Sequence, residues 1–138
     1  MTAPRRFVAS ALLAVVCACA GNPGPGESGY AFNVSGTYSG QFVVDGQGVS
    51  ATLTLQTAPG GVVTGEVRVT EMGITAPAEG TVVASQLHLR IAYRNPGNGC
   101  DGLAEATATI GEGGATFSGP ATITECGQAI GASMSFRR

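Results

Sequence analysis

Short runs in which apolar and polar residues alternate fill the sequence from Ser35 to the C-terminus. Strict alternation is typical of a β-strand that buries one face and exposes the other to water. Glycine-rich segments of hairpin length separate the runs, as at 45–48, 58–61 and 111–114, and glycine adopts the positive φ angles that tight turns need. We predict eight strands, over residues 36–44, 49–57, 62–70, 79–84, 87–94, 102–110, 115–125 and 128–136.

The links between these runs are too short for crossover helices, so the predicted strands pair antiparallel with their neighbours in sequence. The predicted fold class is all-β, an antiparallel up-and-down barrel. Apolar residues point into such a barrel while Thr and Ser point outward, the reverse of a barrel that spans an outer membrane. By parity four glycines also point inward, where glycine lets strands bend sharply as a barrel closes. They are Gly40, Gly65, Gly80 and Gly119, and the alternative is that they are simply weak strand positions.

The N-terminus has the features of an export signal. Arg5 and Arg6 precede an apolar run, residues 7–16, that is too short to span a bilayer as a helix. We therefore predict a signal peptide over residues 1–19. Its end, Val16-Cys17-Ala18-Cys19, resembles the bacterial lipobox, with an unusual cysteine at its second position. The resemblance implies that Cys19 receives lipid and becomes the mature N-terminus. The alternative is ordinary signal cleavage, since Ala-Cys-Ala also satisfies the small-x-small rule, which would give a secreted or periplasmic protein.

Lipid on Cys19 would hold the protein on the cell envelope, because buried lipid methylenes stabilise membrane attachment. In Gram-negative lipoproteins an aspartate after the lipidated cysteine retains the protein at the inner membrane. Ala20 stands there instead, so the resemblance implies the outer membrane. Residues 20–34 are rich in Gly and Pro, lack periodicity and are predicted to form a flexible linker. The barrel domain is predicted over residues 35–138.

The charge balance excludes nucleic acid as a partner. The chain carries seven basic residues, all arginine, against nine acidic ones, and the predicted signal peptide removes two of the arginines. Binding to nucleic acid needs a basic surface that replaces the counterions of the phosphates. We expect a monomer without a nucleic-acid partner.

Two cysteines, Cys100 and Cys126, lie outside the signal peptide. In an exported protein an isolated pair indicates a disulfide, which stabilises a loop of this length by roughly 3 kcal/mol. The alternatives are a metal site or a reactive thiol. His88 is the only histidine, so the ligand set for a metal is poor, and we predict no metal and no cofactor.

The sequence shows no catalytic constellation. His88 falls on the polar face of its strand, and no Gly-x-Ser-x-Gly motif accompanies it. The spacing of the glutamates does not pair them as a general acid and base. They include Glu66, Glu71, Glu105 and Glu125. We therefore predict that the protein is not an enzyme.

A family resemblance is carried by Gly36-Thr37-Tyr38-Ser39-Gly40, by Val63-Thr64-Gly65-Glu66-Val67 and by the late cysteine pair. With these features residues 35–138 resemble the small calycin-like barrels of bacterial lipoproteins. The first motif is also similar to the opening of lipocalin and avidin-like barrels, which carry Gly-x-Trp there. Tyr38 stands in the place of that tryptophan, so the resemblance implies the fold but transfers no binding residue.

Two functions fit a barrel of this size, which either fills with side chains or holds one ligand. The first is a lipid-anchored envelope barrel that binds a small apolar ligand. Its predicted cavity is lined by Leu53, Leu87, Leu89, Tyr93, Phe117 and Phe136. The second is a filled barrel that acts as an interaction or inhibitor protein. Loops predicted at 72–78 and 95–101 would then contact an envelope protein.

Overall fold

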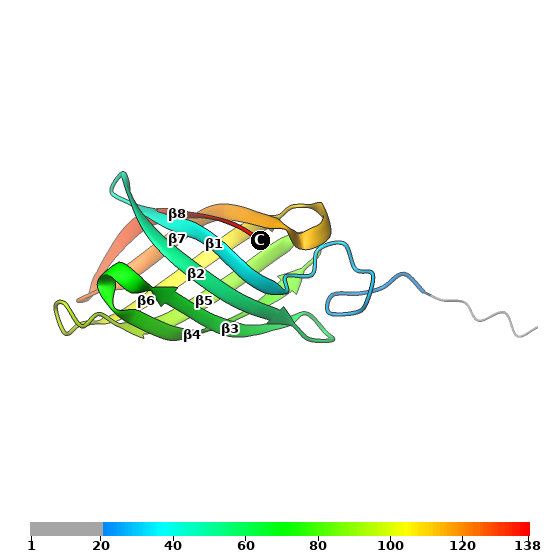
Figure 1. Cartoon of the computed structure of the whole chain (residues 1–138), viewed down its shortest axis with the longest axis horizontal. Coiled ribbons are helices and arrows are strands. Elements are labelled where there is room, and N and C mark those ends of the chain that lie inside the picture. The colour runs from blue at the N-terminus through cyan, green and yellow to red at the C-terminus, as the bar shows by residue number, and fades with distance from the viewer. Residues whose placement is uncertain (1–20) are drawn as a thin grey trace, which may run out of the picture.

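The computed structural model describes residues 21–138, in which eight strands form a closed antiparallel barrel (Figure 1). Each strand pairs with its neighbours in sequence, and β8 closes the barrel by pairing with β1. The predicted all-β up-and-down barrel is confirmed. The strands are β1 (Gly36–Val44), β2 (Gln47–Thr57), β3 (Val62–Val69), β4 (Ile74–Val83), β5 (Gln86–Arg94), β6 (Asp101–Ile110), β7 (Thr116–Glu125) and β8 (Gln128–Arg137). Two short 3-10 helices, η1 (Thr70–Met72) and η2 (Glu112–Gly114), lie in the β3–β4 and β6–β7 connections.

The predicted start of the fourth strand is wrong. The prediction began it at Glu79 and treated 72–78 as a loop, whereas β4 begins at Ile74 and contains Pro77. Proline cannot donate a ladder hydrogen bond, so it is tolerated where a strand lacks a partner on one side. Pairing of β4 with β5 starts only at Ala78, so Pro77 has a partner in register on β3 alone. The other seven strands begin and end within two residues of their predicted bounds.

The alternation of the sequence sets the two faces of the barrel wall. On β5, for example, Leu87, Leu89 and Ile91 are buried while His88 and Arg90 are exposed. The four glycines of the sequence analysis alternate with buried residues and face inward. A Cβ atom on any of them would clash with backbone of the neighbouring strand. These positions therefore let adjacent strands approach closely, as expected for a small closed barrel.

The barrel has two different ends (Figure 1). The β1–β2, β3–β4, β5–β6 and β7–β8 connections lie at one end, which we call the open end. The other three connections, the segment before β1 and the C-terminus lie at the opposite end, which we call the closed end. Among residues 21–138, no helix is long and apolar enough to cross a membrane.

The segment before β1 packs over the closed end. Val34 is fully buried, and its backbone N–H and C=O both bond to the hydroxyl of Thr57, at 3.0 and 2.7 Å. The Tyr30 hydroxyl donates to the carbonyl oxygen of Ala84 at 2.8 Å. The Arg138 guanidinium donates to the carbonyl of Ser35 at 2.7 Å. Residues of the stretch predicted as a flexible linker thus attach to the barrel.

Aromatic side chains fill the interior near the closed end. The ring centroids of Tyr38 and Phe117 are 4.9 Å apart, and those of Phe117 and Phe136 are 5.6 Å apart. The Tyr38 hydroxyl donates to the carbonyl of Gly114 in η2 at 2.6 Å, so even its polar atom is satisfied. The same buried core also contains fully buried aliphatic residues, among them Leu53, Leu87, Val63, Val82 and Met134.

Candidate functional site

The interior near the open end holds an apolar cavity of about 190 Å³. It is lined almost entirely by aliphatic and aromatic side chains from η1 and from the strands at this end of the barrel. The lining residues are Phe42, Val44, Val49, Val67, Val69, Met72, Ile74, Ile91, Tyr93, Ala104, Ile123, Glu125 and Ile130. The two with polar atoms in their side chains are Tyr93 and Glu125.

The size of the inward side chains explains why the cavity lies at this end. The rings of Tyr38, Phe117 and Phe136 occupy the closed half, and Phe42 is the last ring of the row, 5.4 Å from Phe136. Apart from Tyr93, the inward positions beyond Phe42 carry aliphatic residues and Met72, and Ala104 on β6 is the smallest of them. The space that the rings fill in the closed half is therefore only partly filled here, because the volume of the inward side chains decides whether a small barrel is packed or hollow.

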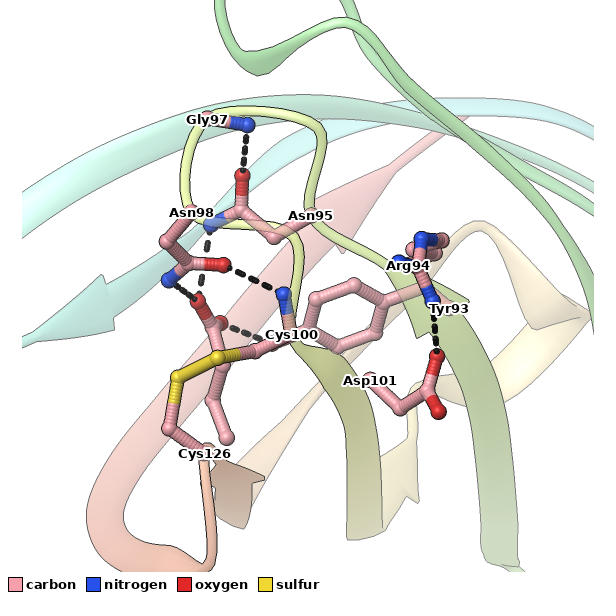
Figure 2. The surroundings of a disulfide bond; sticks show 9 residues. Tyr93, Arg94, Asn95, Gly97, Asn98, Cys100, Asp101 and Cys126 are labelled. Atoms are coloured by element: carbon pink, nitrogen blue, oxygen red, sulfur yellow. Dashed lines mark hydrogen bonds and ion pairs between the residues drawn. A yellow bond between two sulfur atoms is a disulfide. The ribbon is translucent and has the colours of Figure 1, made fainter.

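A disulfide joins two connections at the rim of the cavity. Cys100 lies at the end of the β5–β6 loop and Cys126 lies in the β7–β8 turn, with their Cα atoms 5.3 Å apart (Figure 2). The predicted pairing is confirmed. The bond encloses a separation of 26 residues in sequence, and it indicates that the protein folds in an oxidising environment.

Next to the disulfide, the carboxylate of Glu125 accepts three hydrogen bonds. The Tyr93 hydroxyl donates to Oε2 at 2.6 Å. The side-chain amides of Asn95 and Asn98 donate to Oε1 at 2.7 and 2.6 Å. The asparagines also order their own loop, because their Oδ1 atoms accept from the backbone N–H groups of Gly97 and Cys100 (Figure 2). The β5–β6 loop is thus built around this carboxylate.

Register across three strands brings Tyr93 to Glu125. Gly102 on β6 pairs with Tyr93 of β5 on one side and with Glu125 of β7 on the other. A Cβ atom on Gly102 would clash with the Tyr93 ring. The ring therefore lies over the glycine, and its hydroxyl reaches across the intervening strand. Two strand spacings, about 10 Å, are thereby bridged by a single tyrosine side chain.

These contacts shift the pKa values of both Glu125 and Tyr93. Hydrogen bonds from Tyr93, Asn98 and Asn95 hold the pKa of the Glu125 carboxyl below its ordinary value, because they favour the charged form, and partial burial opposes them. Burial raises the pKa of the Tyr93 phenol, and so does its bond to the negative carboxylate. At neutral pH the pair is therefore an ionised glutamate and a neutral tyrosine that donates to it.

Of the six residues predicted to line a cavity, the structure places one in the open-end cavity and five elsewhere in the core. Tyr93 lines the open-end cavity. The other five are buried and lie outside that lining. They are Leu53, Leu87, Leu89, Phe117 and Phe136. The predicted lipidation site, Cys19, lies outside the described residues.

Sequence reasoning named Glu125 only as one of several scattered carboxylates and gave no role to Asn95 or Asn98. A usable signal was present. Glu125 immediately precedes Cys126, and the two asparagines closely precede Cys100. A predicted disulfide between these cysteines already brings the loop and the glutamate together.

Other candidate groups do not form a site. His88 is exposed on the outer face of β5, with Nδ1 3.4 Å from the Thr107 hydroxyl. It belongs to a wide hollow in the outer wall, about 700 Å³, whose polar side chains are all exposed. Within residues 21–138 no group of three His, Cys, Asp or Glu side chains is arranged to hold a metal ion.

Comparisons of this chain with protein-family models, with curated proteins and with solved structures found no match. The eight-stranded antiparallel barrel is consistent with a calycin-like fold. Since a fold of this kind hosts many functions, the function has to be argued from the cavity itself.

Proposed function

We propose that the barrel binds a small apolar molecule in the open-end cavity. The observation that carries the proposal is an apolar space in one half of a barrel whose other half is filled by aromatic rings. Protein interiors are normally close-packed, and an unfilled apolar cavity lowers stability in proportion to its volume. Apolar pockets with a few polar groups at one side are the usual form of a small-molecule site.

The volume of the open-end cavity limits the size of the ligand. An apolar cavity of about 150 Å³ holds benzene, and the open-end cavity measures about 190 Å³. The part of the ligand inside the barrel is therefore about as large as one aromatic ring or a chain of six carbons. A long acyl chain or a steroid would not fit without displacement of the wall.

Filling the cavity tests this proposal. Ala104 is buried and lines the cavity, whereas Ala92 is exposed on the outer face of β5. In residues 21–138, which include every strand of the barrel, Ala104→Phe should occupy the space and weaken binding of hexan-1-ol at least about tenfold. The control Ala92→Phe should leave binding unchanged. Chemical-shift titration by NMR measures both, and thermal unfolding verifies that each variant is folded.

Equal binding by wild type and Ala104→Phe would show that the alcohol binds elsewhere and would refute the cavity as the site. A folded wild-type domain that binds no six-carbon probe would favour the alternative, an interaction protein that acts through its exposed loops. Of the two loops expected for that role, 95–101 contains the exposed residues Pro96 to Gly99, while 74–78 is part of β4.

We also propose that lipid on Cys19 anchors the barrel to the cell envelope, at the outer membrane. The disulfide supports export to an oxidising compartment. The carbonyl of Pro25 accepts from the N–H of Gly60 at the closed end, so the chain is attached to the barrel six positions after Cys19. Six extended residues span about 20 Å. An anchored barrel would therefore hold its closed end toward the membrane and its cavity toward the aqueous side.

The two cysteines of the lipobox-like segment provide matched variants. Cys19→Ser should move the protein from the membrane fraction to the soluble fraction of a Gram-negative host, because the acyl chains are lost. Cys17→Ser should remain in the membrane fraction. Incorporation of labelled palmitate measures acylation directly. A Cys19→Ser protein that stays labelled and membrane-bound would refute the assignment.

A further inference from the structure

We infer that the ligand of the open-end cavity carries a positively charged amine, which binds the Glu125 carboxylate while one small apolar group enters the barrel. This inference depends on the proposed function, since it specifies the chemistry of the molecule that the same cavity takes. It follows from the juxtaposition of an ionised carboxylate with an otherwise apolar lining.

The three protein donors leave part of the Glu125 carboxylate free. Oε1 accepts from two amides, which occupies both of its lone pairs. Oε2 accepts only from the Tyr93 hydroxyl, so it has one lone pair left for a ligand N–H. Because Glu125 is half-buried and lines the cavity, a donor attached to a molecule in the cavity has access to that atom.

No cation of the described chain neutralises this carboxylate. All three donors to Glu125 are uncharged groups. Within residues 21–138 the two ion pairs are Arg68–Glu66 and Arg94–Asp101. The arginine nearest in sequence to the site, Arg94, is therefore already paired with another acid (Figure 2). A cationic ligand would supply the missing charge.

Other acidic groups reinforce this preference. Asp45 in the β1–β2 turn and Glu71 in η1 also lie at the open end. The two arginines at this end, Arg68 and Arg94, are each paired with an acid. Negative charge around the mouth of a low-dielectric cavity attracts cations and repels anions. A carboxylate-bearing ligand such as a short fatty acid would meet like charges at the mouth, whereas an amine would meet opposite ones.

The charge of the Glu125 carboxylate also favours an amine over a neutral donor. Hydrogen bonds to Glu125 hold its pKa below the ordinary value, so it stays ionised at neutral pH. A neutral hydroxyl can also donate to this carboxylate, but only an ammonium group adds the attraction between opposite charges to the hydrogen bond. Since Glu125 is only half-buried, the ammonium group keeps part of its hydration and avoids the large cost of full desolvation.

Three probes with the same six-carbon chain test the inference: hexylamine, hexan-1-ol and hexanoate. Binding to residues 21–138 is measured at pH 7 by isothermal titration calorimetry and by NMR shifts of the Ala104 and Ile130 methyl groups, which line the cavity. We expect hexylamine to bind about tenfold more tightly than hexan-1-ol. Hexanoate should bind most weakly.

Glu125→Gln should remove the preference for the amine, so that hexylamine binds no more tightly than hexan-1-ol, because the amide carries no charge. Tyr93→Phe should retain the preference, because the carboxylate keeps its charge. Glu105→Gln is the matched control, since Glu105 is exposed on the outer face of β6, and it should bind all three probes as wild type does.

The outcomes separate the two proposals. If all three probes bind with equal affinity, or if Glu125→Gln keeps the amine preference, the inference is wrong and the apolar site stands. If hexan-1-ol and the other probes all fail to bind folded wild type, the proposed function itself is wrong. If the preference for hexylamine disappears in wild type as the pH falls well below 4.5, the ordinary glutamate value, a carboxylate is confirmed as the recognising group without any substitution.

Discussion

The two ends of this barrel are held together by different kinds of interaction. At the closed end, stacked aromatic rings fill the interior, and the segment before β1 covers it with buried Val34. At the open end, the interior is partly empty, and a disulfide and one hydrogen-bonded carboxylate order the loops instead. The closed end is thus fully packed, while at the open end a disulfide and a hydrogen-bonded carboxylate order the loops around an interior that is only partly filled.

This division explains how a small barrel can keep a cavity and remain folded. A barrel domain of about a hundred residues has little stability to spare, and an empty apolar space reduces its stability further. Because the large side chains are concentrated in one half, the closed half of the barrel is fully packed. The disulfide then fixes the rim at a point where side-chain packing is sparse, so the cavity does not require a well-filled core around it.

The largest expected difference between the two ends concerns core truncation. Phe117→Ala should lower the free energy of unfolding by about 4 kcal/mol, and Ile110→Ala by about 3 kcal/mol, because both side chains are fully packed near the closed end. Ile130→Ala should cost only about 1 kcal/mol, because that side chain already borders empty space. Urea unfolding measures all three. Equal losses for the two isoleucines would contradict the division between a packed and a hollow half.

The next largest effect is expected from the disulfide. Replacing Cys100 and Cys126 together by serine should lower stability by about 3 kcal/mol. Native-state hydrogen exchange should locate the change. The amide of Gly99, bonded to the Asn95 carbonyl at the open end, should exchange much faster. The amide of Gly113, bonded to the Ala31 carbonyl at the closed end, should be protected from local opening as before. Uniform acceleration at both ends would show that the disulfide acts globally.

Much of the barrel could be predicted from the sequence because alternation reports directly on which face is buried. β1 agrees with its predicted bounds at both ends, and the inward row of β5 is buried as expected. β4 was predicted too short because a proline inside a strand depends on the register of neighbouring strands. The attachment of Val34 and Tyr30 to the closed end was also missed, since a Gly- and Pro-rich segment has no periodicity even where its few apolar residues are buried.

The candidate site was harder to predict than the fold. Parity places Leu53, Leu87 and Phe117 on the inner face, but it carries no information on their depth along the barrel axis. Whether an inner residue packs or lines a cavity depends on the volume of residues opposite it, which come from other strands. Glu125 becomes important only through bonds to Tyr93 and to a loop about thirty residues earlier. Such a constellation is set by register, which a single sequence specifies weakly.

The smallest expected effect is the pH dependence that Glu125 gives to the open end. Its pKa is lower in the folded protein than in the unfolded chain. Its contribution to stability is therefore fully present above the unfolded value of about 4.5 and is lost as the pH falls through the folded value. Glu125→Gln should be less stable than wild type at pH 7, and the difference should shrink below pH 4.5. Urea unfolding across this range measures the difference.

The control for this effect is Glu105→Gln, which removes the same charge from the exposed outer wall. If its stability difference from wild type shrinks to the same extent as that of Glu125→Gln, the effect arises from net charge rather than from the bonds of Tyr93, Asn95 and Asn98. If only Glu125→Gln behaves this way, the carboxylate orders the rim of the cavity. Acid would then loosen the open end before the closed end, because the bonds from Tyr38 to Gly114 and from Thr57 to Val34 at the closed end involve no carboxylate.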